Sequence, residues 1–130
     1  MAFGTLPGQG QTKARTVWDG VYTAGQASRG METFKTQCAQ CHGENMQGGG
    51  GAPAAAGAEF LFTWNGKNTG ALLDYLKTSM PPNQAGSLSV QRYTDIIAAI
   101  LQASECPAGS TELSADPQAL TEIQITREKP

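Results

Sequence analysis

Apolar residues recur with a helical period in three stretches of the chain. The first stretch begins near Ala24, with Thr23 as its predicted N-cap. Its apolar face carries Ala27, Met31, Phe34 and Cys38. Gly30 lies inside this predicted helix at a cost of about 1 kcal/mol relative to alanine, which predicts a close contact with another helix.

Two further amphipathic helices are predicted in the second half of the chain. The earlier one has Thr69 as its predicted N-cap and ends at Met80, because the two prolines that follow cannot continue a helix. The later one begins at Ser89 and ends before Pro107. Their predicted buried faces carry Leu72, Leu73 and Leu76 in the earlier helix, and Tyr93, Ile96, Ile97, Ile100 and Leu101 in the later one. Residues 58 to 64 form a short apolar piece that predicts one or two additional helical turns.

The remaining segments lack this period. Residues 1 to 16 are predicted to be a loose N-terminal arm, and residues 17 to 106 to be the folded domain. Residues 107 to 130 form a C-terminal tail that either packs on the domain or trails from it, with Ile123 and Ile125 indicating a short extended segment. No pair of strands is predicted, so the pattern indicates an all-α domain with long loops.

Composition narrows the class of protein. The chain has 130 residues, of which 39% are hydrophobic and only 7% aromatic, so we expect one domain at most, with a thin core that leaves room for another group. A net charge of −2 offers no basic footprint for nucleic acid. We expect no membrane-spanning helix, because no stretch approaches the roughly 18 apolar residues that such a helix needs.

One short motif carries the chemistry. Cys38, Cys41 and His42 form the CxxCH signature of c-type haem attachment. The two thiols add to the haem vinyl groups as thioethers, and a two-residue spacer sets the required separation between the sulfurs. The histidine that follows is placed to bond the iron. The motif therefore predicts both the attachment of the haem and one axial ligand, His42, which is the only histidine in the chain.

Two other chemistries use a CxxC pair. A zinc site needs two further ligands, and only Cys106 and carboxylates remain to supply them. A thioredoxin-type dithiol is expected in a βαβ context, which the pattern does not contain. The motif together with an all-α context therefore favours haem.

A c-type haem iron usually has a second protein ligand, and the methionines supply the candidates. Met46 is too close to His42 along the chain to reach the opposite haem face, and Met31 belongs to the apolar face of the first helix. Met80 sits at the end of a helix before two prolines that restrict the backbone, so its thioether is the predicted ligand.

These residues, taken together, resemble a known family. Gly30, Phe34, the CxxCH motif and Met80 followed by proline occur in this order in class I (His/Met) cytochromes c, and the resemblance covers about residues 18 to 104. It is similar in particular to bacterial periplasmic cytochromes c, including those that partner or are fused to quinoprotein alcohol dehydrogenases. The resemblance implies the class I cytochrome c fold, with three main helices, short turns and long loops around one covalently bound haem.

The resemblance also implies roles for individual residues. Gly30 and Phe34 are expected to cross the last helix near residues 96 to 100. The carbonyl of Pro53 is expected to accept a hydrogen bond from Nδ1 of His42. The indole of Trp64 is expected beside a haem propionate, although an ordinary core role is an equal alternative. The apolar haem surroundings are expected to include Phe34, Phe60, Phe62, Leu72, Leu76 and Ile97.

The function implied is electron transfer rather than catalysis. With His42 and Met80 on opposite haem faces, the iron is six-coordinate and has no open position for a substrate. We expect a monomeric carrier between redox protein partners, possible examples being a quinoprotein dehydrogenase and a terminal oxidase. It is expected in the periplasm, after removal of an export signal that this sequence lacks. The alternatives are a haem enzyme or a gas or peroxide sensor with a displaceable Met80, and an electron-relay domain of a larger dehydrogenase. Cys106 is interpreted as an isolated thiol, able to form an intermolecular disulfide if it is exposed.

Overall fold

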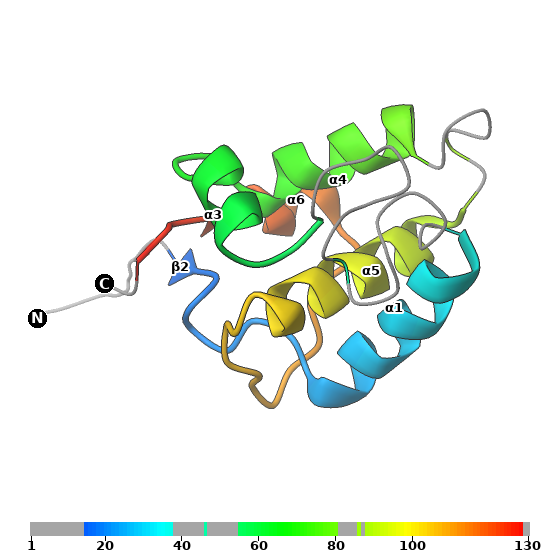
Figure 1. Ribbon diagram of the computed structural model, residues 1–130, viewed down its shortest axis with the longest axis horizontal. Coiled ribbons are helices and arrows are strands. Elements are labelled where there is room, and N and C mark those ends of the chain that lie inside the picture. Colours follow the sequence, from blue (N-terminus) through cyan, green and yellow to red (C-terminus); the bar gives the residue numbers. More distant parts are fainter. Residues whose placement is uncertain (1–14, 38–45, 47–54, 81–85, 87, 129–130) are drawn as a thin grey trace, which may run out of the picture.

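The computed structural model describes residues 15 to 37, 46, 55 to 80, 86 and 88 to 128 (Figure 1). Within these ranges the protein is mainly helical, which confirms the predicted all-α class. The elements in chain order are β2 (Arg15–Thr16), α1 (Ala24–Gln37), α3 (Ala58–Trp64), α4 (Thr69–Ser79), α5 (Val90–Ala103), α6 (Pro117–Leu120) and β3 (Ile123–Gln124).

Helix α5 lies at the centre of the fold and crosses α1 at very short range (Figure 1). A Cβ built on Gly30 would lie 1.8 Å from the backbone oxygen of Asp95, so only glycine fits there. The predicted close helix contact at Gly30 is therefore confirmed. At the edge of the crossing, the guanidinium of Arg29 binds the carboxylates of Asp95, at 3.2 Å, and Glu112, at 2.9 Å.

The helix starts agree with the sequence in two of three cases. Thr23 caps α1 by accepting a hydrogen bond from the Gln26 N–H at 3.1 Å, and the Ser89 side chain caps α5. The predicted cap of α4 was wrong by one residue. Oδ1 of Asn68 accepts from the Ala71 N–H at 2.8 Å, while Thr69 is the first helical residue. The Thr69 hydroxyl instead donates to the Leu120 carbonyl, a buried partner that local sequence does not reveal.

The C-terminal segment packs on the helices. Strands β2 and β3 pair in parallel, and the Ile125 N–H and carbonyl bond to Lys67 and Gly66, which lie between α3 and α4. Ile123 and Ile125 are buried, which confirms the predicted extended segment. The expectation of no strand pair was wrong, because strands of two residues are too short to leave a hydrophobic pattern. The single turn of α6 was missed for the same reason.

Candidate functional site

The structure describes two of the predicted site residues, Met80 and Trp64. The other four, namely Cys38, Cys41, His42 and Pro53, lie outside the described residues. Their roles stay predictions from the sequence.

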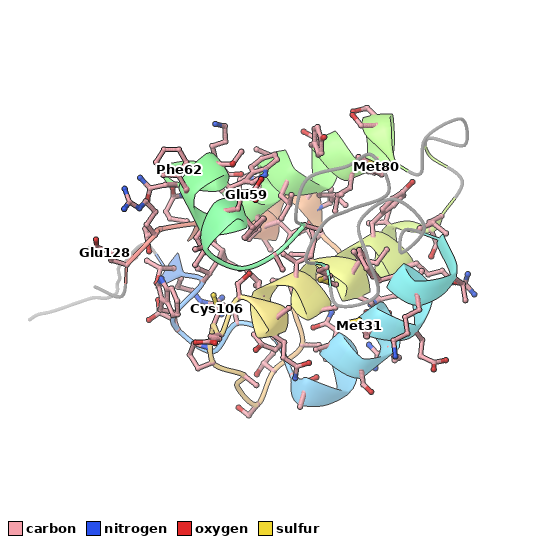
Figure 2. The ribbon with its side chains drawn as sticks, viewed as in Figure 1. Met31, Glu59, Phe62, Met80, Cys106 and Glu128 are labelled. Atoms are coloured by element: carbon pink, nitrogen blue, oxygen red, sulfur yellow. The ribbon has the colours of Figure 1, made fainter. Side chains whose placement is uncertain are left out.

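Met80 lies directly after α4, where the helix gives way to extended backbone (φ −132°, ψ 144°). Its N–H still donates to the Leu76 carbonyl at 2.9 Å, so the residue is attached to the last turn of the helix. The face of α4 that carries Leu72 and Leu73 is buried in the core. The Met80 side chain is partly buried and packs against the core at this end of the helix (Figure 2).

The backbone carbonyl of Met80 has a partner that sequence reasoning missed. The hydroxyl of Tyr93, near the start of α5, donates a hydrogen bond to this carbonyl at 2.6 Å. It also accepts one from the Gly86 N–H at 3.1 Å. The sequence pattern counted Tyr93 only as part of an apolar helix face. The available signal was its hydroxyl, because a buried tyrosine oxygen requires a hydrogen-bond partner.

Comparison with known proteins identifies the family. The family model described as cytochrome c oxidase, cbb3-type, subunit III matches residues 25 to 98, more than half of the chain. The chain belongs to this family. It is a class I c-type cytochrome, as the resemblance in sequence implied. The matched range contains both the CxxCH motif and Met80.

A solved structure supports the same fold. The sulfane dehydrogenase SoxCD from Paracoccus pantotrophus contains a chain similar to this cytochrome, with a TM-score of 0.58 and 22% identity. The match covers 91% of this chain and 68% of the other. At this identity the likeness shows the fold alone, and that fold is the predicted cytochrome c fold. A comparison with curated proteins gives no match.

The one described candidate ligand of the cytochrome, Met80, suits a haem iron. The thioether of Met80 is a neutral, soft donor in a partly buried position, which suits haem iron. Within the described ranges, no three side chains of His, Cys, Asp or Glu gather to hold a metal ion. None of the helices described is long and apolar enough to span a bilayer.

The other internal methionines of the cytochrome both belong to the core. Met31 on α1 is partly buried and packs on the core, as predicted (Figure 2). Met46 is fully buried, which the sequence did not predict. Its backbone adopts a left-handed conformation (φ 63°), and its carbonyl accepts a hydrogen bond from the Ala55 N–H at 2.9 Å. Met46 therefore helps to fill the thin core.

The expected apolar surroundings of the haem need one correction. Phe62 is 68% exposed (Figure 2). The guanidinium carbon of Arg127 lies over its ring, 5.4 Å from the ring centre. The short helix α3 buries Phe60 and Leu61, so a residue one or two positions further along turns toward the solvent. The remaining members of the predicted set are buried: Phe34, Phe60, Leu72, Leu76 and Ile97.

Trp64 ends α3 and is partly buried in the cytochrome. Its ring meets Tyr75 edge to face, with ring centres 5.5 Å apart, and the Lys67 ammonium lies 5.7 Å from the ring centre. These contacts fix the orientation of the indole on the α4 side of the molecule. Its predicted role beside a haem propionate remains a prediction.

Cys106 is buried in the cytochrome, just after α5. Burial raises the pKa of its thiol to about 12, so the group is protonated at neutral pH. The hydroxyl of Tyr22 donates to the Cys106 carbonyl and fixes this end of α5. An intermolecular disulfide was expected only if Cys106 were exposed, and that condition is not met.

Proposed function

We propose that the protein is a one-electron carrier with a single covalent haem c. Cys38 and Cys41 would hold the haem as thioethers, and His42 and Met80 would be the axial ligands. The observation that carries this proposal is the CxxCH motif inside a family match that also includes Met80. The partly buried position of Met80 beside the core supports it.

When bound, haem c supplies an iron that gains and loses one electron. The protein's own residues would keep the surroundings of the iron the same in its oxidised and reduced states. Met80 would occupy the sixth position and so exclude substrates from the iron, while the neutral thioether favours the reduced state. The buried side chains of Phe34, Leu72 and Ile97 would exclude water. The carbonyl of Pro53 would orient the His42 ring by accepting a hydrogen bond from the Nδ1–H of His42. The indole N–H of Trp64 would donate a hydrogen bond to a haem propionate.

The partners we propose are redox proteins of the periplasm. A quinoprotein dehydrogenase is the proposed donor and a terminal oxidase the proposed acceptor, with the carrier acting as a monomer. A net charge of −2 favours docking through a small and largely apolar contact with limited electrostatic steering.

A second candidate function is electron relay within a larger enzyme. Two observations favour it: the matching family is described as an oxidase subunit, and the similar solved structure is a dehydrogenase. Purification from the native host distinguishes the two functions. A carrier elutes alone, whereas a relay subunit elutes with its enzyme.

A spectroelectrochemical titration of the haem-loaded protein tests the proposal. We expect one haem per chain, haem that stays on the denatured polypeptide, and a single one-electron step. The ferric protein should show the Met-to-iron charge-transfer band, and the ferrous protein should not bind carbon monoxide. Ready binding of carbon monoxide would instead support the haem enzyme or sensor with a displaceable Met80.

A further inference from the structure

One buried hydroxyl on α5 holds the backbone at the predicted iron ligand. Tyr93 is only 1% exposed, and its oxygen makes both hydrogen bonds that a phenol most readily makes. It donates to the Met80 carbonyl at 2.6 Å and accepts from the Gly86 N–H at 3.1 Å. The phenol therefore joins two described positions that are six residues apart in the chain.

The backbone of Met80 is consequently held at both of its polar groups. Its N–H donates to the Leu76 carbonyl of α4, and its carbonyl accepts from Tyr93 of α5. Gly86 lies beside the same turn of α4, since a Cβ built on it would be 3.6 Å from the Lys77 carbonyl oxygen. The position of Met80 between α4 and α5 is thus set by specific hydrogen bonds.

We propose that Tyr93 is a positioning residue for ligation of the haem iron by Met80. This inference rests on the proposed function, because it requires His42/Met80 ligation. Methionine has a flexible side chain, so holding its thioether at one point costs conformational entropy. Fixing the backbone lowers that cost and keeps the thioether close to the iron. Without the Tyr93 hydroxyl, the Met80 carbonyl and the Gly86 N–H lose their shared partner, and Met80 becomes easier to displace.

Imidazole competition measures this displacement directly. The haem-loaded ferric protein is titrated with imidazole, and loss of the Met-to-iron charge-transfer band reports replacement of Met80. The Tyr93→Phe variant removes one oxygen and keeps the ring. We expect the variant to bind imidazole about tenfold more tightly, the ratio that follows from losing hydrogen bonding worth about 1.4 kcal/mol.

Tyr22 offers a matched control on the other side of the molecule. It is also buried, and its hydroxyl also donates to a backbone carbonyl, that of Cys106 at the far end of α5. Tyr22→Phe therefore loses the same kind of hydrogen bond away from Met80. Its imidazole affinity should equal that of the wild-type protein. If both variants gained imidazole affinity equally, the effect would reflect a general loss of stability and not the position of Met80. That result would overturn the proposal.

The outcomes separate this inference from the proposed function. A wild-type protein without the charge-transfer band contradicts His/Met ligation itself and therefore both proposals. A band that is present, with identical imidazole affinity in Tyr93→Phe and wild type, overturns only the role of Tyr93. Hydrogen exchange on the wild-type protein adds a test that does not depend on folding of the variant. Gly86 is exposed, so protection of its amide from exchange is expected only if its hydrogen bond to the Tyr93 hydroxyl forms. An unprotected Gly86 amide would contradict the proposed role of Tyr93.

Discussion

The two sides of helix α5 are fixed to their neighbours in different ways. Toward α1 the backbones themselves meet, since Gly30 lets that helix approach the carbonyl of Asp95 (Figure 1). Toward the end of α4, the phenol of Tyr93 bridges the space with hydrogen bonds to Met80 and Gly86. The backbone contact between α1 and α5 is broken only if one of the two helices moves. The hydrogen bonds of Tyr93 are lost when a substitution removes its single hydroxyl oxygen. Mutations can therefore change the packing of α1 on α5 and the position of Met80, the proposed iron ligand, independently of each other.

The largest effect is expected from breaking the backbone contact. In Gly30→Ala, the added Cβ would meet the Asp95 oxygen at 1.8 Å, and backbone atoms on both sides cannot move aside cheaply. Helices α1 and α5 must separate, so we expect the free energy of unfolding to fall by about 3 kcal/mol or more. Denaturant titration of the haem-loaded protein measures this change.

Gly25→Ala is the control on the same helix. A Cβ at Gly25 meets nothing within 4 Å, so this variant should gain up to about 1 kcal/mol from the better helix propensity of alanine. Losses of equal size in both variants would contradict a specific role for Gly30 at the crossing.

On the α4 side, removing the ligand should change the spectrum far more than the fold. Met80→Ala deletes a side chain that is only partly buried while leaving its backbone hydrogen bonds possible. We expect complete loss of the Met-to-iron charge-transfer band, a lower reduction potential and binding of carbon monoxide to the ferrous protein. Absorption spectra and a redox titration measure these changes.

Met31→Ala provides the comparison for Met80→Ala. Met31 also packs on the core but lies on α1, so its loss should lower stability and leave the band in place. A band that survives in Met80→Ala would show that another residue ligates the iron and would contradict the proposed site.

The two sides of α5 also differ in how far the sequence revealed them. The α1 crossing was predictable because a glycine inside an amphipathic helix is costly, so Gly30 signals close packing from the sequence alone. The pattern of α5 likewise gave its cap and its buried face, from Ser89 to Leu101. Long periodic helices record their contacts in the sequence. The pairing of β2 with β3 left no such record, since each strand has two residues.

The candidate site was predictable in its chemistry but not in its support. A CxxCH motif and a methionine before two prolines name their own chemistry, because few other uses need those residue types at that spacing. The link between Tyr93 and Met80 joins residues 13 positions apart, one directly after α4 and the other on α5. It depends on tertiary packing that local pattern does not encode. The exposure of Phe62 was mispredicted for a related reason, since a helix as short as α3 has room for only one buried face.

The last effect concerns the far end of α5 and is absent at neutral pH, because it appears only as the pH rises above 9.0. Burial raises the pKa of the Cys106 thiol from 9.0 to about 12. The unfolded chain therefore loses this proton at a lower pH than the folded protein does. Above that pH, deprotonation stabilises the unfolded state relative to the folded state. The contribution of Cys106 to stability is complete below pH 9.0 and decreases as the pH rises toward about 12.

Cys106→Ala removes this contribution, together with the part of the raised Tyr22 pKa that, after the larger effect of burial, the neighbouring Cys106 causes. Removing the buried thiol costs some packing at every pH, but the difference in unfolding free energy between wild type and variant should shrink as the pH rises above 9.0. Denaturant titrations on either side of that pH measure the difference. A constant difference would mean that the thiol ionises alike in both states, and the end of α5 near Tyr22 would then be open to water. A shrinking difference, with the charge-transfer band of the variant unchanged, would show that this end of α5 supports the fold without influencing Met80.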